Sequence, residues 1–458
     1  HLRLRRNARA HKPLPACPSD TRSACRARRR LRTCSTAAEC TGSSRGHDRT
    51  AWSLREYSRA RAGSFMVTAP DTVIPPPSES AGTVREGSEP VPRYVHPQKF
   101  CPEKERAAAA AHLSEHGFVV FSHALTVAEC EHALDGLWAW LEGLGTGVER
   151  RRPDTWDDER WPRCVEGGIL PFHGIGCSEF MWRIRSNANV RAAFAAVWGV
   201  TSDDLITSLD GAAAFRPWRR RPERRTRGGW LHVDQNPARP EFECVQGLVH
   251  FGPATSHATG GNVLLPGSHR RFGRLSRYAA ELQDDDDFFR LPPDDPLLRD
   301  GGGDDGGDGG SGGGSGSGGI ICLLQRGDLL LWDSRTAHCS APGEGGAVLA
   351  GGEEEEEEDD ELLRAVAFVC LVPRSRASEE VIRRRKAAVR ARVTTAHRPY
   401  VFQPTHEYSV YCDEQMARYS VPRDEPLLTP LAARLVGYSE AEIAAGEHLP
   451  AARSGEGV

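Results

Sequence analysis

Short hydrophobic runs separated by glycine, proline and asparagine characterise the chain from residue 205 onward. Several of these runs alternate apolar and polar positions, which is the period of a β-strand with one buried face. Strands are therefore expected at LITSL, AAAF, WLHVD, CVQGLVHF, NVLLPGSH, IICLL, DLLLWD and RAVAFVCLV. Many short strands at turn-rich spacing predict a sandwich or a jelly roll that closes on itself.

The residues before this region follow a helical pattern instead. Residues 103–116 favour a helix that ends at Gly117, and FVVF follows it as a short buried strand. Thr126 with Glu129 three residues later forms a capping box, which predicts the start of a second helix. A further helix is expected at about 187–198. The predicted fold is mainly β with flanking helices, and the N-terminal helices pack on one face of the β core.

Charge sets the beginning of the chain apart from the rest. Residues 1–65 hold 15 Arg and one Lys against four acidic residues, a balance of +12 that leaves −16 for the remainder. This composition is typical of a disordered basic tail. A targeting (transit) peptide and a translated leader upstream of Met66 are the two main interpretations. A nucleic-acid-binding arm is disfavoured, because the Arg cluster at 26–32 has no interleaved aromatic residues.

The remaining chain divides by composition into a leader, a folded domain and an extension. Residues 66–100 form a Pro- and Ser-rich leader, 101–410 the folded domain and 411–458 a C-terminal extension. The Gly-rich and acidic sequences at 284–319 and 343–361 interrupt the strand pattern, and their composition predicts flexible, solvated insertions. Neither sequence has the alternating Asp and Asn spacing of a calcium-binding loop.

Composition also narrows the class of protein. No run of about 18 uninterrupted apolar residues occurs, which argues against a membrane span. The 13 Cys are scattered singly, which argues against a disulfide scaffold or a zinc knuckle and indicates a reducing compartment. The cytoplasm is therefore the expected location. An organelle is the alternative if the basic N-terminal segment is a transit peptide.

Three residues suggest a metal site. His232 and Asp234 lie two apart in the expected strand WLHVD, and residues two apart in a strand point to the same side. His338 follows another apolar strand, DLLLWD, and a jelly roll brings distant strands together. Two imidazoles and one carboxylate on one face are the ligand set of a non-haem iron(II) site with open positions. A single HxD pair is weak evidence, since composition gives about one by chance, and the strand context strengthens it.

Arg364 is the first residue of the expected strand RAVAFVCLV. A buried guanidinium needs an anion, and it binds a carboxylate through two parallel hydrogen bonds. A dicarboxylate that chelates the metal at one end would present its far carboxylate to Arg364. An Arg exposed to water on an edge strand is the alternative, and spacing alone leaves the two interpretations equally open.

Several stretches together resemble the phytanoyl-CoA dioxygenase (PhyH-like) family of iron(II)- and 2-oxoglutarate-dependent oxygenases: GFVVF, GWLHVDQNP, CVQGLVHF, GGNVLLPGSH, GDLLLWDSRTAHCSAPG and RAVAFVCLVPR. The similarity covers residues 110–400. It implies a double-stranded β-helix (jelly-roll) core. The implied iron(II) ligands and catalytic residues are His232, Asp234 and His338. Arg364 would anchor the cosubstrate 2-oxoglutarate, and the hydroxyl of Ser340 would support the same carboxylate.

The resemblance also implies a reaction. A small organic or acyl substrate is hydroxylated by O2 while 2-oxoglutarate is converted to succinate and CO2, with ascorbate as a reductant. Gln246 and Asn262 are expected on strands that face the barrel interior, and both are candidates to contact 2-oxoglutarate or substrate. The interval from His338 to Arg364 is longer than the family pattern because of the acidic insertion. Arg335, three residues before His338, is therefore the fallback anchor.

Two other function classes remain open. A jelly-roll metal enzyme that does not use 2-oxoglutarate, such as an isomerase or a metal-only dioxygenase, would keep the triad but would not need Arg364 and Ser340. A non-catalytic ligand-binding barrel would make the triad incidental. A second metal site made of His250, His257 and His269 is a weaker hypothesis, because loop histidines commonly hydrogen-bond turns. The sequence indicates neither the substrate nor the oligomeric state.

Overall fold

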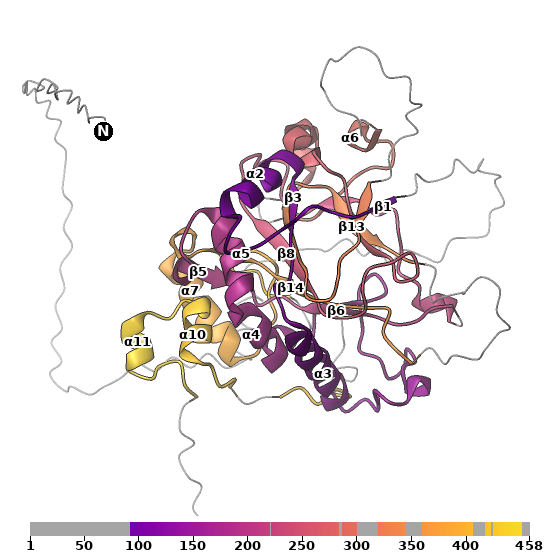
Figure 1. Cartoon of the computed structure of the whole chain (residues 1–458). Coiled ribbons are helices and arrows are strands. Elements are labelled where there is room, and N and C mark those ends of the chain that lie inside the picture. Colours follow the sequence, from indigo (N-terminus) through magenta and orange to yellow (C-terminus); the bar gives the residue numbers. More distant parts are fainter. Residues whose placement is uncertain are drawn as a thin grey trace, which may run out of the picture. The chain divides into compact units, whose positions relative to one another are not determined.

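The strands expected from the hydrophobic pattern assemble into two larger sheets in the computed structural model of the chain (Figure 1). The structure describes residues 92–219, 221–283, 286–299, 319–343, 360–405, 417–422 and 425–450. All of them belong to one compact unit, Arg85–Val458. The predictions for residues 1–65, for most of the leader and for much of both insertions lie outside the described residues.

The first sheet has the strand order β1-β11-β9-β13-β7-β10. Its strands are β1 (Arg93–Val95), β7 (His232–Val233), β9 (Gly261–Leu264), β10 (Phe289–Arg290), β11 (Ile320–Cys322) and β13 (His338–Ala341). β1 and β11 pair in parallel, and the other neighbours are antiparallel. β1 lies in the described end of the predicted leader and extends this sheet.

The second sheet has the order β2-β3-β12-β8-β14-β6-β4. Its strands are β2 (Lys99–Phe100), β3 (Phe118–Phe121), β4 (Ile169–Leu170), β6 (Ala212–Phe215), β8 (Val245–His250), β12 (Leu329–Asp333) and β14 (Arg364–Val369). Only β2 and β3 are parallel within this sheet as described. A separate antiparallel pair joins β5 (Leu205–Thr207) to β15 (Leu371–Pro373).

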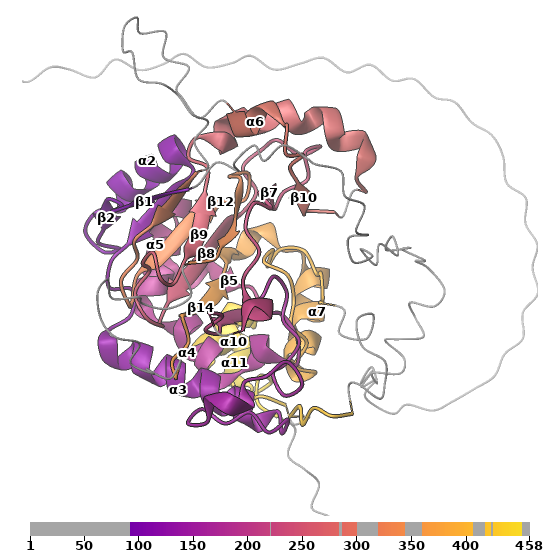
Figure 2. The same cartoon turned by 90° about the vertical axis from the view of Figure 1, so that its right-hand side faces the viewer.

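The two sheets pack face to face. One buried cluster contains side chains from both of them: Val120, Leu248, Leu330, Trp332 and Val366 of the second sheet, with Leu264, Ile320 and Cys322 of the first. Figure 2, turned by 90°, shows β8, β9 and β12 running through the centre of the molecule. Alternate residues of these strands therefore point into one shared interior.

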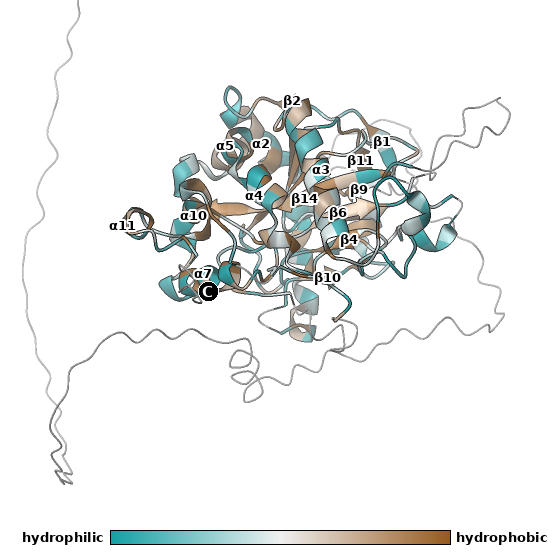
Figure 3. Ribbon diagram, turned by 90° about the horizontal axis from the view of Figure 1, so that it is seen from below, coloured by the Kyte–Doolittle hydropathy of each residue, from teal (hydrophilic) through white to brown (hydrophobic). Residues whose placement is uncertain are grey.

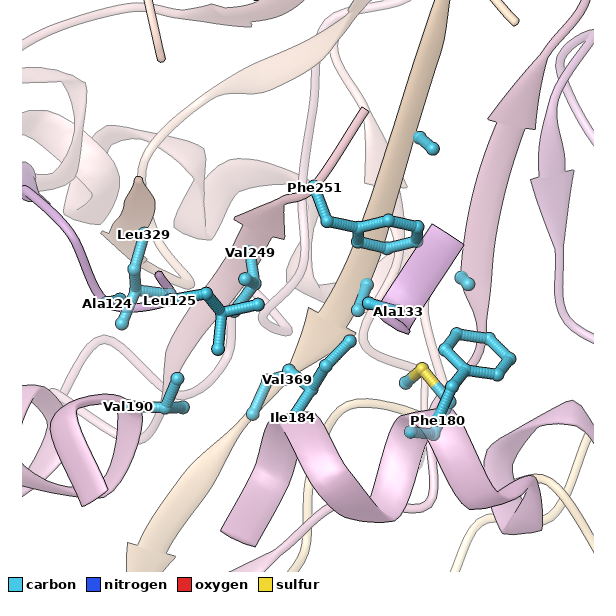
Figure 4. Close-up of a cluster of buried hydrophobic side chains, with 14 of the residues drawn as sticks. Ala124, Leu125, Ala133, Phe180, Ile184, Val190, Val249, Phe251, Leu329 and Val369 are labelled. Carbon is cyan, nitrogen blue, oxygen red and sulfur yellow. The ribbon is translucent and has the colours of Figure 1, made fainter. Parts of the chain in front are cut away.

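Four helices cover the outer face of the second sheet. They are α2 (Arg106–His116), α3 (Val127–Gly143), α4 (Glu179–Ser186) and α5 (Ala188–Trp198). Three of them, α2, α3 and α5, correspond to helices expected from the sequence. In the largest buried cluster, Phe180 and Ile184 of α4 pack with Val249 and Val369 of the sheet and with Phe251, which follows β8 (Figure 4). This packing fixes the second sheet from behind and leaves its inner face to the first sheet.

Two local predictions about these helices are confirmed. Thr126 caps α3, and its hydroxyl accepts a hydrogen bond from the backbone N–H of Glu129, whose carboxylate in turn accepts from the backbone N–H of Thr126. α2 ends at Gly117, whose φ of +80° lies in the left-handed region. A Cβ at Gly117 would also collide with His269 and Thr336. Glycine is therefore required at this turn.

The described structure contains helices that the hydrophobic pattern does not predict. They include α4, the 3-10 helix Ser268–Glu281 and the α-helices α6 (Pro296–Arg299), α7 (Glu379–Arg390), α10 (Pro430–Val436) and α11 (Glu440–Ala444). α7 has the sequence EEVIRRRKAAVR and buries only a narrow stripe, so its charged residues mask the helical period. In Figure 3 the strands carry mainly hydrophobic colours, whereas the helices carry both hydrophilic and hydrophobic segments. The fold is mixed helix and sheet, with mostly antiparallel sheets.

Within the described residues, none of the helices combines the length and the apolar character that crossing a bilayer requires.

Candidate metal centre

β7 and β13 are neighbours in the first sheet, and their register brings two histidines together. His232 lies directly opposite His338 in the antiparallel ladder. Val233 packs into a cluster with Leu265 and Phe272 on the outer side of the sheet. Strand alternation therefore turns the side chain of His232 toward the interior. Asp234 follows at the end of β7, where its backbone N–H donates to the carbonyl of Ser334.

The three side chains converge. Nε2 of His232 lies 3.5 Å from Oδ1 of Asp234, and Nε2 of His338 lies 3.3 Å from Oδ2 of the same carboxylate. One potential ligand atom from each residue lies within 4.8 Å of the other two, and this trio is the only such group of three or more found in the described residues. The spacing is that of ligands around a single metal ion.

Backbone carbonyls orient both imidazoles. Nδ1 of His232 lies 3.3 Å from the carbonyl oxygen of Trp230, and Nδ1 of His338 lies 2.9 Å from that of Thr336. A proton on each Nδ1 satisfies these carbonyls and leaves the lone pair of each Nε2 directed at the shared space. Metal-bound histidines are held in this way, with the other ring nitrogen donating to a carbonyl or carboxylate.

Burial and neighbouring groups set the charges at the site. Burial lowers the pKa of His232, and the adjacent His338 lowers it further. Burial opposes ionisation of Asp234, but the charges and hydrogen bonds of His232 and His338 outweigh it and hold the Asp234 pKa well below its usual value. At neutral pH the site therefore offers a carboxylate and a neutral imidazole at His232, which are the forms that bind a cation.

Gln246 and two tryptophans surround the candidate ligands. The side-chain amide of Gln246 on β8 donates to Oδ2 of Asp234 at 2.7 Å, so its contact here is with the carboxylate. The indole of Trp230 stacks on His232 with ring centroids 4.7 Å apart and an interplanar angle of 5°. Trp332 lies 5.1 Å from the ring of His338. These contacts restrict the rotamers of all three candidate ligands.

Arg364 is buried at the start of β14 and points into the same interior. Its Nη2 donates to the hydroxyl of Ser340 at 3.4 Å, and its guanidinium carbon lies 3.9 Å from the centre of the Phe215 ring. Nε and Nη1 are buried and have no hydrogen-bond partner within the described part of the chain. Burial lowers the Arg364 pKa to about 10, which leaves the group charged at neutral pH. A buried cation without a counter-charge is costly unless an anion binds beside it.

Arg335, the alternative candidate for binding the 2-oxoglutarate carboxylate, makes other contacts. Its guanidinium contacts the carboxylate of Asp333 at 2.7 Å and donates to the carbonyl of Pro240. Between the two arginines, Arg364 is therefore the one with free donors in the interior.

The three histidines of the hypothetical second metal site are separated. His269 contacts the carbonyl oxygen of Ser114 through Nε2 at 3.0 Å, and His257 packs its ring on Tyr94 with centroids 3.9 Å apart. His250 is buried at the end of β8. Within the described ranges they form no group that could hold a metal ion.

The structure adds residues that sequence reasoning missed. The ring of Phe288, a half-exposed side chain, lies 4.8 Å from that of His232. Nε2 of His397 lies 3.3 Å from the backbone oxygen of Asp234, and Asp287 pairs with Arg398 at 2.7 Å. These residues flank an acidic run or follow the last strands, and no spacing rule connects them to the HxD pair.

Two surface clefts lie apart from the metal cluster. One, of about 260 Å³, is lined by α3 and α4 residues that include His132 and Arg183. The other, of about 520 Å³, is lined by Trp138, Arg150 and Arg326 among others. None of the candidate ligands lines either cleft.

Comparison with known proteins gives one curated relative. No family model matches the chain. "Ava biosynthesis cluster protein O" of Aspergillus versicolor is 24% identical over 319 residues, which cover 69% of this chain and 92% of that protein.

Solved structures that resemble the chain include ThoJ, EctD and SnoN. The apo form of the non-heme monooxygenase ThoJ is 18% identical over 58% of this chain and 77% of its own, with a TM-score of 0.35. EctD from S. alaskensis, solved with 2-oxoglutarate and 5-hydroxyectoine, is 16% identical over 64% and 86%, with a TM-score of 0.37. The non-heme alpha ketoglutarate dependent epimerase SnoN, from nogalamycin biosynthesis, is 16% identical over 59% and 84%, with a TM-score of 0.33. TM-scores below 0.5 do not establish a shared fold.

Proposed function

We propose that the chain is an iron(II)- and 2-oxoglutarate-dependent dioxygenase that hydroxylates a small organic or acyl substrate and releases succinate and CO2. The observation that carries the proposal is the pairing of a His-Asp-His cluster with a buried arginine that has free donors. We further propose that the two facing sheets form a double-stranded β-helix of the PhyH-like kind.

The residues fit iron(II). His232 and His338 would supply one nitrogen each and Asp234 one oxygen, all from one side, which leaves the remaining positions of an octahedral ion open. The bound ion would supply oxygen activation coupled to the oxidative decarboxylation of 2-oxoglutarate. The chain's own task is to hold these ligands, keep the imidazoles in the Nε2-binding tautomer and exclude bulk water.

The distance to Arg364 fits a five-carbon dicarboxylate. Ser340 lies two residues after His338 on β13, so about 7 Å of strand separates the metal ligand from the hydroxyl that contacts Arg364. 2-Oxoglutarate has four carbon–carbon bonds of about 1.5 Å each. A 2-oxo acid group at the metal would therefore bring the far carboxylate within reach of Nε and Nη1 of Arg364. An enzyme that uses the metal alone has no evident need for this cation.

The first test is turnover in the absence of added substrate. The protein, loaded anaerobically with iron(II), is given 2-oxoglutarate, ascorbate and then O2, and succinate is measured. We expect slow succinate formation that EDTA abolishes and that His232→Ala lacks, because both remove the metal. If iron binds but neither succinate nor a charge-transfer band with 2-oxoglutarate is seen, the metal-only enzyme is the better interpretation. If no divalent metal binds, the chain is better interpreted as a non-catalytic ligand-binding barrel than as either kind of metal enzyme.

Gln246 should tune the metal affinity without touching the cosubstrate. Gln246→Leu removes the hydrogen bond to Oδ2 of Asp234, so the carboxylate loses one of its fixed contacts. Loss of such an outer contact typically weakens metal binding about 10- to 100-fold. We expect a decrease of this size in iron(II) affinity, measured by chelator competition.

The matched control is Gln325→Leu, the same chemical change at an exposed position. It should leave the iron(II) affinity unchanged. Equal affinities of wild type and Gln246→Leu would show that the hydrogen bond does not orient the ligand.

A further inference from the structure

His250 faces the interior beside Arg364. Gln246 and Leu248 precede it on the same face of β8, and they contact Asp234 and the inner hydrophobic cluster respectively. β8 pairs with β14 so that His250 lies opposite Val366, two residues after Arg364. Such diagonal neighbours are within reach of long side chains. The imidazole and the guanidinium are therefore adjacent on one sheet face.

The ring of His250 is buried and unsatisfied. His250 is 1% exposed, and neither of its ring nitrogens has a hydrogen-bond partner in the part of the chain that the structure describes. Burial lowers the His250 pKa to about 3, and the charges of Arg364 and Arg326 act in the same direction. A neutral imidazole carries one N–H donor and one lone pair. Leaving both unused in the interior is costly, so a bound ligand is the natural partner.

A third unpartnered group lies at the same place. Asn262 on β9 is directly opposite Ser340 on β13, and Ser340 accepts the hydrogen bond of Arg364. The amide nitrogen of Asn262 is buried and has no acceptor among the described residues. Arg364 and Asn262 therefore both neighbour Ser340, and His250 neighbours Arg364 within the second sheet.

We propose that His250 is a positioning residue for the far carboxylate of 2-oxoglutarate: one ring nitrogen accepts from Arg364, the other donates to the carboxylate, and Asn262 adds a further donor. The inference rests on the proposed function and deepens it. It makes the site selective for 2-oxo acids that carry a second carboxylate. A glutamine at 250 offers the same two functions, because its oxygen accepts and its nitrogen donates. A phenylalanine keeps the ring shape and offers neither.

The test is an anaerobic titration of the iron(II)-loaded protein, followed by the charge-transfer band. 2-Oxoglutarate is compared with 2-oxobutanoate, which keeps the 2-oxo acid and lacks the second carboxylate. His250→Phe should raise the Kd for 2-oxoglutarate by at least about tenfold, the effect of losing a hydrogen bond to a charged group. It should leave the Kd for 2-oxobutanoate unchanged, and His250→Gln should restore most of the affinity for 2-oxoglutarate. Asn262→Ala should show the same selective loss if His250→Phe does not fold.

Three outcomes would overturn the proposal. One is an unchanged Kd for 2-oxoglutarate in His250→Phe. Another is an equal loss for both acids, which would indicate a merely structural role. The third is a wild-type protein that binds iron but neither acid, which would refute the proposed function and this inference with it; the first two leave the proposed function intact.

Discussion

Replacing His338 by alanine should abolish succinate formation, with a decrease of at least about 10³-fold, as expected for loss of an essential member of a catalytic group. The reason is geometric: His338 supplies one of two imidazole nitrogens that converge on Asp234, and its ladder partner His232 cannot replace it. Iron(II) content after dialysis should fall together with activity. Both are measured on the same anaerobically loaded sample, by metal analysis and by succinate assay.

The control for this experiment is His132→Ala. His132 is exposed on α3, which packs on the outer face of the second sheet, whereas β13 belongs to the first sheet; its replacement should change neither iron content nor activity. His338→Ala that retained wild-type iron affinity would remove the His-Asp-His cluster from consideration as the metal site.

Replacing Arg364 by methionine should raise the Kd for 2-oxoglutarate at least about 30-fold. Truncating one partner of a buried charge pair typically costs about 2–5 kcal/mol, and 1.4 kcal/mol corresponds to tenfold. In the ligand-free protein, by contrast, the same substitution should not lower stability. Arg364 is a buried cation whose Nε and Nη1 have no partner in the described chain, so an apolar side chain of similar length should leave the melting temperature unchanged or raise it.

Arg335→Met is the matched control for the anchor. Arg335 is held by Asp333, so its replacement should leave the Kd for 2-oxoglutarate near the wild-type value while lowering stability slightly. The two Kd values are read from the same charge-transfer titration. A larger loss in Arg335→Met than in Arg364→Met would reverse the assignment of the anchor.

Local patterns in the sequence were enough to predict much of the fold. Strands such as β8 and β12 are largely apolar segments bounded by turn residues, and the Thr126 capping box by itself indicates the start of a helix. The charged helix α7 escaped prediction because its packing partners, not its own period, make it a helix. Tertiary contacts of this kind produce no local pattern in the sequence from which the helix could be predicted.

In the candidate site, too, local features could be predicted from the sequence and tertiary contacts could not. The HxD spacing predicts that His232 and Asp234 share a strand face, since alternation is a local property. The placement of His338 opposite His232, and of Gln246 on Asp234, depends on the register of strands far apart in the chain. Register is set by the complete sheets. Sequence spacing could therefore identify these residues as candidates, but it could not predict which of them contact each other.

The ladder between β7 and β13 has a consequence for insertion tolerance. The separation of the two imidazoles is fixed by the hydrogen-bonded register of β7, β9, β10 and β13, and the length of the connection between α6 and β11 does not enter into it. Lengthening a connection costs little, about 0.6 kcal/mol for each doubling. Segments of different length between α6 and β11 should thus be interchangeable without disturbing the ligand geometry. That connection is a suitable place to graft a reporter peptide or an affinity tag onto the protein.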